Sequence, residues 1–153
     1  ERYEGLNVSG YGIVYDEYRR QPLKWGNPLI ETSWLPDNSS NDSTLSVIDQ
    51  LTDSQSLLKH YMTLGQLRKE NPALMFGNSF EAFKDNNSNI QGYIRHYTYQ
   101  DVNQAVLVIH NFSVNTQTLN LDYLDILFGD DLILNSYETI VLNIDPSLIG
   151  DYI

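Results

Sequence analysis

The clearest periodic pattern in the chain predicts one amphipathic helix. Between Ser54 and Asn71, apolar side chains recur at the i, i+3, i+4, i+7 spacing of one helical face, at Leu57, Leu58, Tyr61, Met62, Leu64 and Leu67. Thr52 and Gln55 have the spacing of a capping box, and Pro72 disfavours helical geometry at the residue before it. We therefore expect a helix that follows this cap and ends at Asn71.

After Pro72 the pattern changes to short β-type runs. They are Ile90–Tyr99, Ala105–Phe112, Thr118–Leu121 and Tyr137–Ile144, with a weaker run at Leu132–Leu134. Residues 104–112 are almost continuously apolar, which predicts a central strand covered on both faces. The short spacing of the runs is typical of an antiparallel all-β sandwich.

The N-terminal third shows neither period. Residues 1–35 are rich in Gly, Pro, Tyr and Trp and are predicted to form loops and short turns, whereas the polar residues 36–46 predict an exposed loop. The organisation is therefore a part of loops and helix, followed by antiparallel strands. We place the domain boundary so that residues 1–75 form the first part and residues 76–153 the second.

Composition excludes several classes of function. Nine basic and twenty acidic residues give a net charge of −11, which repels phosphate backbones and anionic lipids, so we expect neither a nucleic acid nor a membrane partner. The absence of cysteine removes disulfides, thiolate metal sites and thiol nucleophiles. A neutral ligand rich in hydroxyl groups, such as a carbohydrate, remains compatible with this surface.

Three segments in order carry a family resemblance. The first is Arg20-Gln21-Pro22-Leu23-Lys24-Trp25, and the second and strongest is Ser56-Leu57-Leu58-Lys59-His60-Tyr61 followed by residues 67–74, Leu-Arg-Lys-Glu-Asn-Pro-Ala-Leu, and Gly77. The third is Gly92–Arg95 with Val106–Ser113 and the closing run Tyr137–Leu142. Together they resemble the α-amylase clan of glycoside hydrolases. Residues 30–34, Ile-Glu-Thr-Ser-Trp, resemble a segment of secreted bacterial α-amylases and favour that type over an α-1,6-glucosidase.

The resemblance implies a fold for this chain, and it implies that the catalytic residues lie in another part of the parent enzyme. The fold is an α+β fragment, with loops and one or two helices from the end of a (β/α)8 barrel followed by an antiparallel Greek-key β-sandwich domain. The parent would cleave α-glucosidic bonds with retention, through two carboxylates and a covalent glycosyl intermediate. In the family the catalytic carboxylates follow earlier barrel strands, upstream of the first matching segment. We therefore expect a chain that stabilises the barrel and has no catalytic residue, metal or cofactor of its own.

Arg20 and Trp25 are the candidate substrate-binding residues. A guanidinium donates a fixed fork of hydrogen bonds to carboxylate or sugar oxygens, and an indole ring stacks on a pyranose. The structural alternative is that Arg20 ties a loop to a barrel carboxylate and that Trp25 is buried. Trp34 has the same two interpretations. One face of the predicted strand Ile90–Tyr99 carries Tyr93, Tyr97 and Tyr99. These rings could bind a sugar, or they could pack against aromatic residues of neighbouring strands.

The remaining polar residues give no local site. His60, His96 and His110 are too far apart in sequence for a local metal motif, and we interpret each as a packed or surface imidazole. The adjacent acids Asp130 and Asp131 are interpreted as a solvated loop.

Three classes of function stay open at this point. They are the C-terminal region of an α-glucan-acting hydrolase, an independent carbohydrate-binding β-sandwich, and a structural or interaction module. The predicted helix with its Pro-Ala-Leu exit favours the first. The partners it implies are the upstream catalytic barrel, an α-glucan bound by the parent, and a second copy or the β-domain docked on the Ser56–Asn71 helix face. We expect a secreted parent, with the cytoplasm as the alternative.

Overall fold

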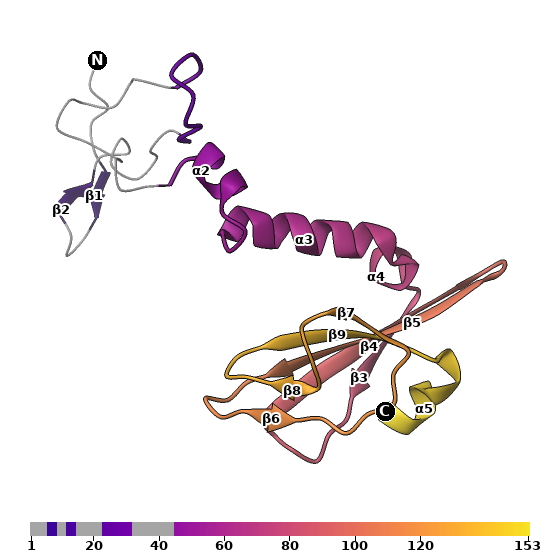
Figure 1. Ribbon diagram of the computed structural model, residues 1–153. Helices are drawn as coiled ribbons and strands as arrows, with labels where there is room; N and C mark the ends of the chain where they lie inside the picture. The colour runs from indigo at the N-terminus through magenta and orange to yellow at the C-terminus, as the bar shows by residue number, and fades with distance from the viewer. Residues whose placement is uncertain (1–5, 9–11, 15–22, 32–44) are drawn as a thin grey trace. The chain divides into compact units, whose positions relative to one another are not determined.

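The computed structural model describes residues 6–8, 12–14, 23–31 and 45–153, with side chains from residue 23 onward (Figure 1). The chain divides into two compact units, Glu1–Thr63 and Leu64–Ile153, called here the N-terminal and C-terminal units. No helix among these described residues is long and apolar enough to cross a membrane.

The N-terminal unit contains two short strands and a capped helix. β1 (Leu6–Val8) and β2 (Gly12–Val14) pair antiparallel, so the prediction of loops and turns alone for residues 1–35 was wrong here, because three-residue strands are too short to show a period. Helix α2 (Val47–Thr52) was not predicted. It starts with a capping box in which Ser46 Oγ accepts a hydrogen bond from Asp49 N over 3.1 Å, and the Asp49 carboxylate accepts one from Ser46 N over 2.9 Å.

Two predictions were wrong in detail, one for the polar loop that ends at Ser46 and one for the helix cap at Thr52. Ser46 is buried, although it falls at the end of the predicted exposed loop, and the rest of that loop up to residue 44 lies outside the described residues. Thr52 does not cap the next helix, because its hydroxyl donates to Asp49 O within α2 over 2.8 Å. Ser56 Oγ takes that role and accepts from Lys59 N over 3.2 Å.

The predicted amphipathic helix is α3 (Leu57–Glu70), and α4 (Pro72–Phe76) follows it directly. Pro72 ends α3 as predicted, but it also occupies the first turn of α4, where its missing N–H costs nothing. Part of the apolar stripe is covered and part is exposed. Leu67 packs against a core cluster of the C-terminal unit, whereas the exposed fractions of Leu57 and Tyr61 are both 66%.

The C-terminal unit is built on a five-stranded antiparallel sheet with the order β3-β4-β5-β9-β7. In chain order these strands are β3 (Ser79–Phe83), β4 (Ile90–Tyr99), β5 (Val102–Asn111), β7 (Asp125–Phe128) and β9 (Thr139–Ile144). A second, two-stranded sheet pairs β6 (Gln117–Thr118) with β8 (Ile133–Leu134), and the chain continues through a 3-10 turn (Pro146–Leu148) into α5 (Ile149–Tyr152). β4, β5, β8 and β9 lie within or largely over their predicted runs, whereas β6 overlaps the predicted run Thr118–Leu121 at Thr118 alone, so the prediction of a strand there was wrong beyond Thr118. β3 and β7 are additional.

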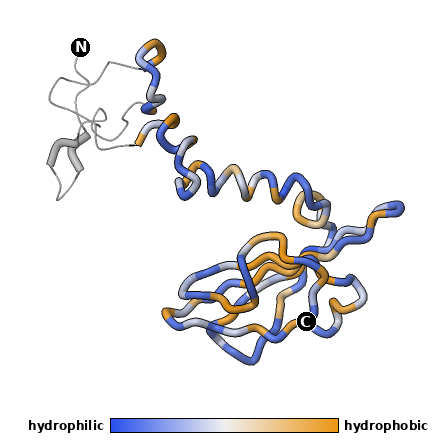
Figure 2. The backbone as a smooth tube through the Cα atoms, in the orientation of Figure 1, coloured by the Kyte–Doolittle hydropathy of each residue, from blue (hydrophilic) through white to orange (hydrophobic). Residues whose placement is uncertain are grey.

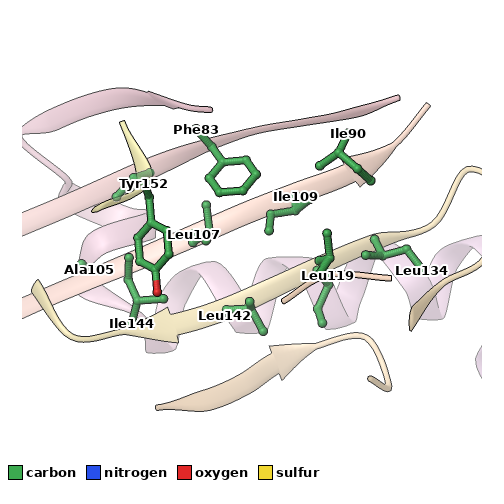
Figure 3. Packing of buried hydrophobic residues seen from close by; sticks show 12 residues of the cluster. Phe83, Ile90, Ala105, Leu107, Ile109, Leu119, Leu134, Leu142, Ile144 and Tyr152 are labelled. Carbon is green, nitrogen blue, oxygen red and sulfur yellow. The ribbon is translucent and has the colours of Figure 1, made fainter. Parts of the chain in front are cut away.

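The central strand β5 is buried on both faces, as predicted. Ala105, Leu107 and Ile109 enter one hydrophobic cluster, and Val106 and Val108 enter a second on the opposite face. Figure 3 shows the first cluster, to which Phe83 and Ile90 contribute from neighbouring segments, Leu134 from β8, and Tyr152 from α5. Figure 2 shows the apolar residues gathered along the central strands of this unit.

The β4–β5 hairpin is longer than the strands beside it. β3 pairs with β4 only from Gly92 to His96, and β9 pairs with β5 only from Ala105 to His110. The turn end of the hairpin therefore extends beyond the five-stranded sheet (Figure 1).

Candidate functional site

Trp25 lies on a loop that is hydrogen-bonded to the start of α2. Val47 N donates to Lys24 O over 2.8 Å, and Ile48 N donates to Trp25 O over 3.2 Å. These bonds satisfy backbone donors that a helix leaves unpaired in its first turn. The loop is thereby fixed to α2, while the Trp25 side chain keeps an exposed fraction of 41%.

Gly26 and Glu31 set the shape of this loop. Gly26 has φ = +82°, and a Cβ at this position would lie 2.5 Å from Ser46 Oγ, so no larger residue fits against the helix cap. The Glu31 carboxylate accepts hydrogen bonds from Gly26 N and, over 3.3 Å, from Trp25 N. Arg20 and Trp34, the other candidates in this region, lie outside the described residues.

Asp49 is the acidic group beneath this loop, and its role is structural. Hydrogen bonds from the Ser46 side chain and backbone hold the pKa of the Asp49 carboxyl below its usual value, with a smaller contribution from the Lys24 ammonium. The hydrogen bonds that cap α2 therefore favour the ionised form of the Asp49 carboxyl.

The second and third motif segments meet at the junction between α4 and the sheet. Arg95 Nη2 donates to Gly77 O over 2.6 Å. A Cβ at Gly77 would lie 2.4 Å from Ala73 O and 2.8 Å from Arg95 Nε, so glycine is required for this close approach. This arrangement gives the matched residues Ala73, Gly77 and Arg95 a structural role.

The aromatic face predicted on β4 includes rings from neighbouring strands that the sequence analysis did not assign to it. Four rings form a continuous set, called here the aromatic row: Phe80 of β3, Tyr93 of β4, His110 of β5 and Phe112 just beyond it. Successive ring centroids are 5.2, 6.4 and 5.7 Å apart, with interplanar angles of 22°, 42° and 67°. Cross-strand aromatic packing, the structural alternative, therefore accounts for Tyr93.

A second aromatic group lies at the base of the projecting hairpin. Tyr97 contacts Phe76 of α4 with ring centroids 5.9 Å apart, and Tyr99 with centroids 6.5 Å apart. Tyr99 and Phe76 have exposed fractions of 60% and 61%. Phe80 was missed from the sequence, because the register that places it opposite Arg95 becomes visible only when β3 is paired with β4.

The three histidines have different local contacts. His110 Nδ1 is 2.8 Å from Thr139 Oγ1, and partial burial lowers the pKa of His110 by disfavouring the charged imidazolium. His96 Nε2 is 2.7 Å from Asn103 Oδ1 on the hairpin, and His60 contacts Tyr61 edge-on in α3. In the part of the chain that the structure describes, no three His, Asp or Glu side chains are grouped so that they could hold a metal ion.

Comparison with known proteins finds relatives over most of the chain, although no family model matches it. The chain is 34% identical to the α-amylase SusG of Bacteroides thetaiotaomicron over 125 residues, which is 78% of this chain and 18% of that protein. It is 28% identical to an oligo-1,6-glucosidase of Parageobacillus thermoglucosidasius, over 78% of this chain and 21% of that protein. The chain thus spans about a fifth of the length of these relatives.

Solved structures share the fold at lower sequence identity. A mutant of the trehalulose synthase MutB superposes with a TM-score of 0.59 at 21% identity, over 82% of this chain and 25% of that one. At this identity the likeness concerns the fold.

Proposed function

The chain belongs to the α-amylase family of glycoside hydrolases, and we propose that it forms the C-terminal region of an α-glucan-acting enzyme of the α-amylase type. The observation that carries this proposal is the 34% identity to an α-amylase over 78% of the chain. The parent would cleave α-glucosidic bonds with retention, which requires two carboxyl groups about 5–5.5 Å apart.

This chain would not itself be catalytic. Several of the described acidic side chains support turns and helix ends. For example, Asp49 caps α2, Asp145 caps the turn at Pro146, and Asp131 Oδ1 accepts from Ile133 N over 2.8 Å. We place the catalytic carboxylates in the upstream barrel, and the main contribution of this chain would be to stabilise that barrel.

The proposal extends to the finer fold. Residues 1–75 would be the end of a (β/α)8 barrel, and residues 76–153 a Greek-key β-sandwich. Two observations support the second part. β3 to β9 all follow residue 76, and the connection between the neighbouring strands β5 and β9 carries β6, β7 and β8.

The test compares the full-length parent with this chain alone, at equal molar concentration, on amylose, maltotetraose and isomaltose. The parent is expected to release reducing sugar from at least one of these substrates, and the chain alone from none. Hydrolysis by the chain alone, or a folded parent inactive on every α-glucoside, would contradict the proposal.

Trp25, together with Arg20 five residues before it in the same motif, is proposed to contact substrate. The half-exposed indole supports this role, because an accessible ring can stack on a pyranose. In the parent, Trp25→Ala is expected to raise KM for a long α-glucan with little change in unfolding temperature. Trp25→Phe is the matched control, since it keeps an aromatic face. A drop in unfolding temperature with unchanged KM would assign Trp25 a packing role.

A carbohydrate-binding β-sandwich is the second candidate, and the exposed ring of Tyr99 on the projecting hairpin favours it. Native electrophoresis through amylopectin tests it, with gels lacking polysaccharide as the control. Wild-type chain is compared with Trp25→Ala and with the triple substitution of Tyr93, Tyr97 and Tyr99 by alanine. Retardation that the triple variant loses would support the binding module, and unretarded wild-type chain would exclude it.

A further inference from the structure

We propose that the aromatic row of Phe80, Tyr93, His110 and Phe112 is the surface on which the catalytic barrel of the parent packs. This inference rests on the proposed function, because it requires a parent longer than this chain. It goes beyond that function by assigning the contact to one face of the sheet and to named residues.

The two faces of the five-stranded sheet differ in how completely this unit covers them. On one face, Leu119 and Leu134 from the region of the small sheet and Tyr152 from α5 close over the strands, and each is at most 8% exposed (Figure 3). On the other face, Leu67, Ala73 and Leu74 of the helical segment pack against the second cluster. The aromatic row lies on this second face, and its Phe80 and Phe112 stay exposed.

The exposure of the row is unusual for phenylalanine. Phe80 is 60% exposed and Phe112 is 57% exposed, and the two are joined through Tyr93 and His110 by ring contacts. Two exposed rings joined by partly buried ones form a contiguous apolar surface, and such a surface marks an interaction site, whereas apolar side chains scattered singly do not. Aromatic anchors of this kind dominate the energy of interfaces when they become buried.

The point at which the chain enters the sheet domain indicates which protein surface covers the aromatic row. The end of α3 and α4 lie on this same face, through Leu67, Ala73 and Leu74, so the chain enters the C-terminal unit at this face of the sheet. The relatives are about five times longer than the matched region. A covalently attached neighbour has a high effective concentration and needs only a modest contact area to dock.

The geometry of the row is poorly suited to a sugar. Its interplanar angles open from 22° to 67°, so the rings present no common plane on which consecutive pyranose units could stack. The row also contains no permanently charged side chain, and burial favours the neutral form of His110. Both features suit an apolar protein surface.

Hydroxyl-radical footprinting of the full-length parent and of this 153-residue chain tests the proposal, with Tyr137 as the reference. Phe80 and Phe112 are expected to be oxidised several-fold more slowly in the parent than in the chain. Tyr137, which is 66% exposed and precedes β9, should react equally in both. Equal reactivity of Phe80 and Phe112 in both proteins would overturn the proposal. So would protection in the chain alone that grows with its concentration or on addition of maltoheptaose, because a second copy or a sugar would then cover the row.

A substitution made in both proteins separates docking from local packing. Phe80→Ser is expected to lower the unfolding temperature of the parent by more than that of the chain, since only the parent would bury this ring. Val114→Ser, at a site 70% exposed and outside the row, should act equally in both. Equal shifts for Phe80→Ser would contradict the proposal. Neither readout uses hydrolysis, so a parent with a protected row and no activity on α-glucans would refute the proposed function while the docking surface stands.

Discussion

Gln104 in the central strand holds Asn71 at the end of α3, through a hydrogen bond of 2.9 Å from its Nε2 to Asn71 Oδ1. Its Oε1 accepts from Ala73 N over 3.0 Å, and Asn71 Nδ2 donates to Leu67 O over 2.8 Å. Asn71 is 7% exposed, so these polar groups have little access to water. One side-chain amide therefore fixes the junction of α3 and α4 to the sheet.

Gln104→Ala is expected to lower the free energy of unfolding by about 1–2 kcal/mol, because it leaves the Asn71 Oδ1 and the Ala73 N–H without their partner. Urea unfolding of the chain measures the change. Gln91→Ala, at an exposed position of β4, is the matched control and should change the free energy little. An equal effect of the two substitutions would show that the Gln104 contacts do not hold the junction.

Asn111 is the next site where a large effect is expected. Its Nδ2 donates to the carbonyls of Asn115 and Asn135 over 2.7 Å each, its Oδ1 accepts from Ser113 N over 2.9 Å, and it is 1% exposed. Asn111→Ala should cost about 3 kcal/mol, since several buried groups lose their partner at once. Asn120→Ala, at an exposed position, is the control. Thermal unfolding that shifts equally for both variants would contradict this role.

Two glycines are expected to respond to alanine in opposite directions. A Cβ at Gly92 would lie 2.4 Å from Val108 O across the β4–β5 ladder, so Gly92→Ala should destabilise by about 2 kcal/mol. A Cβ at Gly65 in α3 meets nothing within 4 Å, so Gly65→Ala should stabilise by up to about 1 kcal/mol through helix propensity. Unfolding midpoints in urea measure both. A shift of the same sign in the two variants would contradict the packing described.

His110 should make stability depend on pH. Burial lowers its pKa in the folded state, so the unfolded chain binds the proton first as the pH falls. The contribution of neutral His110 is therefore complete above the unfolded pKa of about 6.5 and is lost as the pH falls from there toward the folded pKa. Urea midpoints at about pH 7.5 and pH 5.5 should decline more for wild-type chain than for His110→Gln. Equal declines would show that the imidazole titrates alike in both states.

Local pattern predicted most of the regular structure. β4 has the bounds that its alternation predicted, and β5 is central because its apolar run can be buried only between two clusters. β3 and β7 were missed, since each has only a few residues and is fixed by pairing with a longer strand, β4 and β9 respectively. α2 was missed because its first turn is stabilised by Ser46 at the edge of a polar segment.

The candidate site was predicted less completely than the fold. Trp25 was recognised from its motif, but its attachment to α2 depends on backbone hydrogen bonds that no side-chain pattern records. Tyr93 was recognised as part of an aromatic face, whereas Phe80 and Phe112 join it only through the register of β3 and the end of β5. The aromatic row depends on which strands pair and in which register, and the sequence pattern alone does not show this.

The most direct measurement of the central claim is the anomeric configuration of the first product released by the full-length parent from maltotetraose, followed by proton NMR before mutarotation. A retaining enzyme of the α-amylase type should release the α-anomer, and the chain alone should release no product. Initial release of the β-anomer, or cleavage by the chain alone, would contradict the assignment of this chain to the C-terminal region of such an enzyme.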